Sequence, residues 1–288
     1  MKKYSEEQQK ALNLINTGDM AFIELALQLN ISNNLELDFE DYETLYVWLD
    51  KYAPKGVSAY RVKQLYKIHE VVNRTSIDFQ NSDIWDLPAC FYKMHKLKDL
   101  NLKGNSIEYF PPRFHKLGYL KYLNFVDNAL RSLPKKIGEL VALEELYLDK
   151  NELCSLPESI GQLFKLRVLS LESNLLSHLP SYVGKLKNLL TLDLTYNKLT
   201  SLSKNIGQLK SLETLVLHQN QLTTLPDSFC ELGQLQTLNL SANYLETLPK
   251  GIEKLQNLTF MDLRYNSFTD SYIAKLQDLL PNCDILFD

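Results

Sequence analysis

The sequence predicts a protein of the α/β class: a solenoid of stacked repeats with a parallel sheet, preceded by an α-helical N-terminal region. One observation is a 23-residue repeat that returns eight times without an insertion. Another is the strict alternation of apolar residues in the first part of each repeat, which is typical of a short strand. The third is the helical spacing of apolar residues before residue 74.

The repeat follows the template LxxLxLxxNxLxxLPxxIGxLxx, and its positions are called slots 1 to 23 below. A degenerate copy begins at Arg74, with Ser82 in place of the asparagine of slot 9. We therefore expect nine turns over residues 74–268, the last of them incomplete. The eight regular copies begin at Leu97, Leu120, Leu143, Leu166, Leu189, Leu212, Leu235 and Leu258.

A single repeat cannot fold alone. Ordering one residue costs ~1–2 kcal/mol of backbone entropy, whereas burying one leucine returns ~1.5–3 kcal/mol. The few apolar slots of a repeat cannot offset 23 ordered residues. Stacking of neighbouring repeats supplies the missing burial and a parallel hydrogen-bond ladder.

These repeats resemble those of leucine-rich repeat proteins. The LPxxIGxL half resembles the intracellular Ras-suppressor-like class with its typical 23-residue repeat, and also small bacterial leucine-rich repeat proteins. The segment LLPNCDILF, residues 279–287, resembles the closing segment of such bacterial proteins. The resemblance implies a right-handed horseshoe with the parallel sheet on its concave face. It also implies a non-enzymatic scaffold that binds a protein or peptide.

The asparagines of slot 9 are expected to form a structural ladder. At this slot the chain leaves the strand and turns inward, which leaves backbone groups without partners. A buried amide can satisfy such groups in its own turn and in the adjacent one. The ladder residues are Asn105, Asn128, Asn151, Asn174, Asn197, Asn220, Asn243 and Asn266.

The convex side should be extended or form single helical turns, because slot 15 holds a proline in most repeats. The glycines of slot 19 are expected to permit tight turns there. These slots hold Pro134, Pro157, Pro180, Pro226 and Pro249, and Gly138, Gly161, Gly184 and Gly207.

Both ends of the stack are expected to be capped, because a solenoid otherwise exposes its core. Residues 1–73 are predicted to be helical, with a capping box at Ser5 and Gln8, a break at Thr17–Asp19, and further helices over 22–29, 42–52 and 58–72. Residues 269–288 are predicted to form a helix, with Ile273, Leu276, Leu279 and Leu280 on its apolar face, and a final strand. Residues 1–73 could instead be a helical effector module controlled by the repeats.

Composition narrows the function. The net charge of −4 gives no basic excess for nucleic acid, and no apolar run approaches the ~20 residues of a membrane helix. No secretory signal is visible, and the four scattered cysteines fit reduced thiols. We therefore expect a cytoplasmic monomer, although a secreted effector acting on another cell is an alternative. No catalytic motif, metal pattern or cofactor motif occurs in the sequence, so we expect no enzyme, metal or cofactor.

Slots 3, 5, 7 and 8 should face the concavity, because the leucines of the strand point inward. We expect these slots, Thr195 among them, to be exposed and free for recognition. Aromatic side chains beside acids favour a partner that offers apolar and basic groups. The central patch is Tyr122, Val126, Glu145, Tyr147, Asp149, Val168, Glu172 and Asp193, and a second patch toward the C-terminus is Tyr196, Val216, His218, Phe260, Arg264 and Tyr265.

Overall fold

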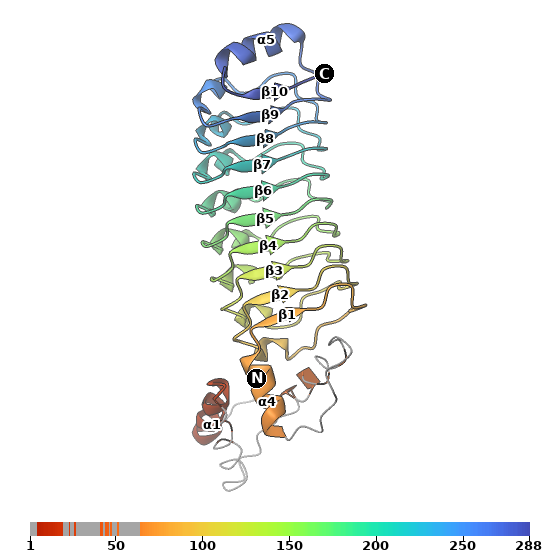
Figure 1. The fold of residues 1–288 in the computed structure, drawn as a ribbon, viewed down its shortest axis with the longest axis vertical. Coiled ribbons are helices and arrows are strands. Elements are labelled where there is room, and N and C mark those ends of the chain that lie inside the picture. The colour runs from red at the N-terminus through yellow and green to blue at the C-terminus, as the bar shows by residue number, and fades with distance from the viewer. Residues whose placement is uncertain are drawn as a thin grey trace.

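The computed structural model shows one elongated stack of turns with a helix at each end (Figure 1). It describes residues 5–19, 23, 26, 41, 42, 44, 45, 47, 51 and 64–288. The helices predicted over 22–29 and 42–52 fall mainly outside the described residues. The α-helices whose full bounds lie in the described residues are α1 (Glu6–Asn16), α4 (Gln64–Asn73) and α5 (Asp270–Leu279).

Ten parallel strands form a single sheet whose order follows the sequence from β1 to β10. Leucines pair with the leucines of the next turn, as Leu146 does with Leu169. The strands are β1 (Ser76–Asp78), β2 (Asp99–Asn101), β3 (Tyr122–Asn124), β4 (Glu145–Tyr147), β5 (Val168–Ser170), β6 (Thr191–Asp193), β7 (Thr214–Val216), β8 (Thr237–Asn239), β9 (Phe260–Asp262) and β10 (Asp284–Leu286). The predicted parallel solenoid is therefore confirmed.

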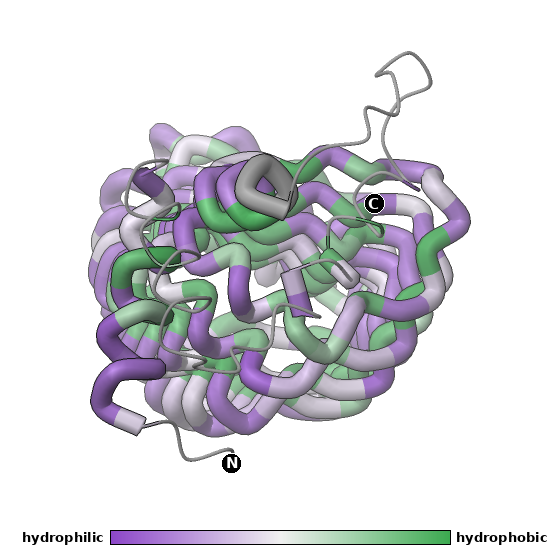
Figure 2. The backbone as a smooth tube through the Cα atoms, turned by 90° about the horizontal axis from the view of Figure 1, so that it is seen from below, coloured by the Kyte–Doolittle hydropathy of each residue, from purple (hydrophilic) through white to green (hydrophobic). Residues whose placement is uncertain are grey.

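Seen along the stack, the turns lie over one another, so equivalent slots form lines that run the length of the molecule (Figure 2). The leucines of these lines are buried, and Leu146, Leu169 and Leu192 are all 0% exposed. Near the N-terminal end, phenylalanines replace leucines in the core. The rings of Phe110 and Phe125 lie 4.8 Å apart there.

The strands are short because slot 8 turns the chain. Its residue adopts the left-handed region in all nine turns, with φ between +53° and +67°. Only one of these residues is glycine, although other residues lose roughly 1–2 kcal/mol in this region. The residues are Asn81, Gly104, Asp127, Lys150, Ser173, Tyr196, Gln219, Ala242 and Tyr265.

The convex side consists of one-turn 3-10 helices, as the prolines predicted. They are η1 (Phe91–Lys93), η2 (Phe114–Lys116), η3 (Ile137–Glu139), η4 (Glu158–Gln162), η5 (Ser181–Lys185), η6 (Lys204–Gln208), η7 (Asp227–Glu231) and η8 (Ile252–Lys254). Pro157 and Pro180 stand immediately before their helices in extended conformation. An extended residue followed by a single turn keeps the convex side nearly as short as the strand side, so the turns can stack closely.

The glycines of slot 19 have a different role from the predicted one. Gly138, Gly161, Gly184 and Gly207 are not among the residues with positive φ. A Cβ atom on Gly161 would instead lie 2.4 Å from the carbonyl oxygen of Tyr182 in the next turn. The absence of a side chain therefore permits close stacking of neighbouring turns.

The described part of the N-terminal region packs on the first turns. Helix α1 begins with the predicted capping box of Ser5 and Gln8. Its buried Ile15 and the buried Ile68 of α4 belong to the same apolar cluster as the repeat leucines. The carbonyl of Asn16, at the end of α1, lies 2.9 Å from His95 Nε2, and the ammonium of Lys96 donates to the carbonyl of Thr17. The repeats thus supply the positive charge that favours the C-terminal end of α1.

The C-terminal end is covered by α5 and then by β10. Thr269 caps α5, and Ile273 and Leu276 are buried beneath the helix. Leu279, which was expected on the same apolar face, is 47% exposed. Strand β10 pairs in parallel with β9, and Ile285 faces Met261.

Candidate binding face of the parallel sheet

The candidate residues lie along the side of the sheet that faces away from the leucine core, on successive strands from β3 onward. Most are half-buried between their neighbours, and those nearest the turns are exposed. Tyr122, Val126, Glu145, Tyr147, Asp149, Val168, Glu172, Asp193 and His218 are half-buried, whereas Tyr196, Arg264 and Tyr265 are exposed.

Two tyrosines on neighbouring strands form the apolar part of the central patch. The rings of Tyr122 and Tyr147 lie 5.6 Å apart, within the range of favourable aromatic pairs. The hydroxyl of Tyr147 donates to Glu145 Oε2 over 2.9 Å. Burial, followed by this bond to Glu145, raises the pKa of Tyr147 to about 12. Tyr147 therefore stays neutral at physiological pH, and its bond to Glu145 holds its ring in place beside Tyr122.

Asp149 is the most embedded carboxylate of the central patch. Its Oδ1 accepts from the Ser170 hydroxyl over 2.5 Å and from the backbone N–H of Glu172 over 2.7 Å. Burial raises the pKa of Asp149 above its ordinary value, and the nearby Asp193 raises it further. Asp149 therefore supports the next turn and carries a poorly solvated negative charge.

The acids of the central patch are not paired with basic side chains in the described part of the chain. Glu145, Asp149, Glu172 and Asp193 form no ion pair with any lysine, arginine or histidine in the described part of the chain. Successive strands lie ~4.8 Å apart, so these carboxylates share one surface. Their mutual repulsion is relieved by any cation that binds there.

Slot 5 is less free for recognition than expected. In six turns its Asp or Asn side chain accepts from the backbone N–H two residues later, as Asp193 does from Thr195 over 2.9 Å. Such Asx turns provide an acceptor for the backbone N–H at the end of the strand, just before the left-handed residue. Thr195 itself is only 9% exposed, so its expected exposure is wrong. The recurrence of Asp and Asn in slot 5 was the signal in the sequence for this structural role.

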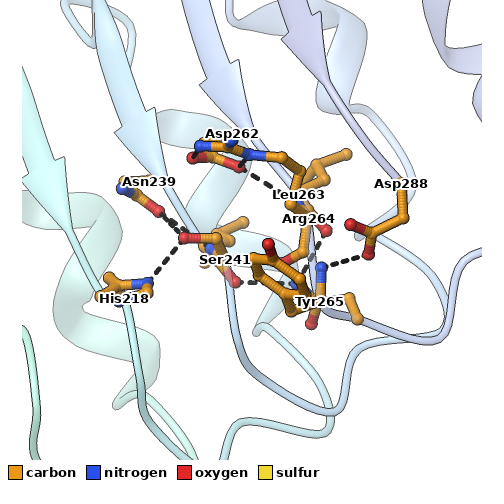
Figure 3. A network of polar contacts seen from close by, with 10 residues as sticks. His218, Asn239, Ser241, Asp262, Leu263, Arg264, Tyr265 and Asp288 are labelled. Atoms are coloured by element: carbon orange, nitrogen blue, oxygen red, sulfur yellow. Dashed lines mark hydrogen bonds and ion pairs between the residues drawn. The ribbon is translucent and has the colours of Figure 1, made fainter.

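The C-terminal candidates form a connected polar network (Figure 3). The Ser241 hydroxyl lies 2.6 Å from Asn239 Oδ1 and 2.7 Å from His218 Nδ1. Because the hydroxyl donates its one proton to Asn239, His218 Nδ1 donates to it. Ser241 is 3% exposed, so it is not open to a substrate as a nucleophile.

Arg264 and Asp262 form a two-bond ion pair at the end of the same network (Figure 3). Burial raises the pKa of Asp262, but the bonds from Arg264 outweigh this effect and hold the pKa below its ordinary value. The ring of Tyr196 meets His218 edge-on at 5.3 Å, and the N–H of Tyr265 donates to the Asp288 carboxylate. The charges of this second group are therefore neutralised internally, unlike those of the central patch.

The slot-9 asparagines form a continuous ladder through the interior. Asn174 accepts from the N–H of Leu153 over 3.0 Å and donates to the carbonyls of Leu148 and Leu171 over 2.9 and 3.1 Å. The same set of bonds, shifted by 23 residues each time, recurs at Asn128, Asn151, Asn197, Asn220 and Asn243. Each amide thus joins its own turn to the preceding one.

The described residues form neither a metal centre nor an activated thiol. They contain no cluster of three or more His, Cys, Asp or Glu side chains with which to hold a metal ion. All four cysteines are free, and burial raises the pKa of Cys90 and of Cys283 to about 11. Within the same residues no helix has the length and apolar character needed to cross a membrane.

The fold and the repeat geometry define a leucine-rich repeat solenoid. The model of the leucine-rich repeat region family matches residues 111–193 and 166–280, which is more than half of the chain. The chain therefore belongs to the leucine-rich repeat family. No curated protein sequence matches it significantly.

Solved structures of repeat proteins are similar over most of the chain. A leucine-rich repeat protein of Leptospira interrogans, LIC12759, is 37% identical with a TM-score of 0.74, and the match covers 78% of this chain and 57% of that one. This chain thus spans little more than half the length of that relative. The plant peptide hormone receptor RGFR1, solved with RGF2, is 25% identical with a TM-score of 0.59, covering 70% of this chain and 33% of that one.

A third match comes from an octameric complex of Latrophilin 3, Unc5D and FLRT2, in which FLRT2 is the component labelled as the leucine-rich repeat. It is 25% identical with a TM-score of 0.62, and the match covers 74% of this chain and 69% of that one.

Proposed function

We propose that the protein is a non-enzymatic interaction scaffold that binds a protein or peptide on the central patch of its concave face. The observation that carries this proposal is the group of four carboxylates without basic partners, placed beside the Tyr122–Tyr147 pair. A partner with basic and apolar side chains would relieve the repulsion between the acids and cover both rings. The similar structures solved in complex with a peptide or with proteins are consistent with such a role.

The central patch is a better candidate than the second patch, because the charged side chains of the second patch already have partners. His218, Arg264 and Asp262 already satisfy one another or their neighbours, so a partner would have to break these bonds. The carboxylates of the central patch retain acceptor capacity, because none of them forms an ion pair with a described cationic side chain. Binding there is expected to weaken with salt and with acidification, since both reduce the attraction of carboxylates for a cation.

The test uses a variant that carries Tyr122→Ala, Tyr147→Ala and Asp149→Asn. Asparagine keeps an oxygen for Ser170 and Glu172, so the last change removes charge without removing the acceptor. The matched control carries Tyr109→Ala, Tyr244→Ala and Glu246→Gln, which alter exposed residues outside the concave slots.

Affinity capture from lysate, followed by titration of each captured protein, compares the two variants with the native chain. A bound protein should lose more than about tenfold in affinity for the concave variant, because buried aromatic anchors are worth ~2 kcal/mol or more. The control should bind like the native chain. Equal affinity for the concave variant, or capture of nothing by the native chain, would contradict the proposed function.

A further inference from the structure

A cavity of about 350 Å³ lies where α1 meets the convex side of the first two turns. Gln9 and Asn16 of α1 contribute to its lining together with Tyr92, Lys93, Arg113 and Lys116 from η1, η2 and their flanks. Its volume is within the ~300–1,000 Å³ of pockets that hold small molecules. The cavity lies on the convex side, whereas the central patch lies on the sheet, and the two have charges of opposite sign.

Three cations surround one aromatic ring in this cavity. The centre of the Tyr92 ring lies 5.1 Å from Arg113 Cζ, 5.6 Å from Lys116 Nζ and 5.8 Å from Lys93 Nζ. None of the described lining residues is an acid. Lys93 has Asp41 at 3.7 Å, whereas Arg113 and Lys116 take part in no ion pair in the described part of the chain.

The Tyr92 ring alone does not offset the repulsion between the three cations around it. A cation over an exposed tyrosine gains ~0.5–1 kcal/mol, whereas neighbouring like charges repel one another. The hydroxyl of Tyr92 accepts from Arg113 over 2.9 Å, which fixes the guanidinium at the cavity. An anion within reach of both Arg113 and Lys116 would remove the repulsion, and a guanidinium matches the geometry of phosphate or carboxylate.

The backbone of Arg113 is strained while it makes this contact. Its φ is +63°, and in the other regular turns only Gly251 has positive φ at the equivalent slot 17. A residue other than glycine loses roughly 1–2 kcal/mol there. Strain of this kind is found where a side chain must be aimed at a particular place.

His95 also lines the cavity, at the junction between the first turn and α1. Its Nδ1 lies 3.0 Å from the carbonyl of Lys93, and its Nε2 lies 2.9 Å from the carbonyl of Asn16. Carbonyl oxygens only accept, so the ring satisfies both contacts when both nitrogens carry protons. The contact with Asn16 joins the first turn of the repeats to the end of α1.

We propose that this cavity binds a small anionic molecule through its phosphate or polycarboxylate group, with Arg113 and Lys116 as the principal ligands. The size of the cavity favours a small molecule over nucleic acid, and the net charge of −4 offers no wider basic surface. This site is independent of the concave face, so either proposal stands if the other fails.

The test is thermal unfolding of the full chain with pyrophosphate or citrate as the probe, against sodium chloride of equal ionic strength. At ten times its dissociation constant, a bound probe should raise the melting temperature by about 3 °C. Stabilisation by pyrophosphate alone identifies a phosphate site, and stabilisation by citrate alone identifies a carboxylate site. No rise with either probe beyond that with chloride would overturn the proposal.

Matched variants locate the site. Arg113→Gln with Lys116→Gln should abolish the rise, whereas Lys165→Gln with Arg167→Gln removes equal charge from a distant groove and should retain it. Arg113→Gly should relieve the strained backbone and unfold at the native temperature or above in chloride, but it should respond at least tenfold more weakly to the probe. A full response of either Arg113 variant would overturn the assignment.

Discussion

At the scale of single residues, the molecule separates positions that hold the turns together from positions that carry charge. Slot 9 holds asparagine in eight turns because an amide both donates and accepts, and the buried turn requires both. Slot 8 has an equally strict backbone requirement, yet its residues range from aspartate to tyrosine. Several residue types tolerate the left-handed conformation of slot 8, so the sequence shows no residue pattern that would predict it.

The ladder leads to a stability prediction. Asn174→Ala should lower the free energy of unfolding by ~1–3 kcal/mol, because the buried N–H of Leu153 loses its acceptor. The carbonyls of Leu148 and Leu171 each lose one of their two amide donors. Chemical denaturation measures this loss. The control is Thr214→Ala, a half-buried concave position without a comparable role, which should change stability by no more than ~0.5 kcal/mol. Equal losses for the two variants would contradict a supporting role of the ladder.

At the scale of elements, the convex turns are held together by close backbone approach. The slot-19 glycines look like turn residues in the sequence, since glycine is common where φ is positive. The structure shows that they are spacing residues, because a Cβ atom on Gly207 would meet the carbonyl oxygen of Ser228 at 2.0 Å. The reason lies in the neighbouring turn, so no local pattern could reveal it.

A pair of glycine substitutions tests this interpretation. Gly161→Ala should destabilise the protein by ~1–3 kcal/mol, because the backbone carbonyl of Tyr182 cannot move away cheaply. Gly233→Ala should be neutral or stabilising by up to ~1 kcal/mol, because nothing lies within 4 Å of its added Cβ and the unfolded chain loses freedom. Denaturant midpoints of the two variants give the comparison, and a harmless Gly161→Ala would disprove close stacking as the reason for glycine.

At the scale of the whole molecule, the central patch and the cavity at α1 carry opposite charge and lie on different sides of the solenoid. The acids of the central patch lie on the sheet, and the cations around Tyr92 lie on the convex side. The near-neutral total conceals this separation, because it sums over both faces. The composition gives no basic excess, and it does not reveal the local basic cavity.

The role of the N-terminal region also concerns the whole molecule. We propose that residues 1–73 cap the first turn, since Ile15, Ile68 and Val71 are buried in the same cluster as the repeat leucines. Deletion of residues 1–73 should expose Ile77, Phe91 and Leu97 and yield an aggregating or unfolded remainder. Circular dichroism and size-exclusion chromatography would measure this. A stable, monomeric remainder would favour the alternative of a separate helical effector module.

The sequence by itself determined the period, the parallel stack, the buried leucines, the asparagine slot and the residues on the strand face away from the core. Each of these features follows from residue types that recur every 23 residues. One copy would be a weak indication of structure, but eight copies in register are a strong one. Only the tertiary structure decided which of the exposed slots are already engaged. It tied Asp193 and Asp149 to neighbouring backbone, neutralised Arg264 with Asp262, and gathered Tyr92, Arg113 and Lys116 around one cavity. The contacts of Asp193 and Arg264 join residues two positions apart, and the side-chain geometry decides whether they form. The contact of Asp149 and the cavity depend on packing between turns and with α1, which spacing along the chain does not set.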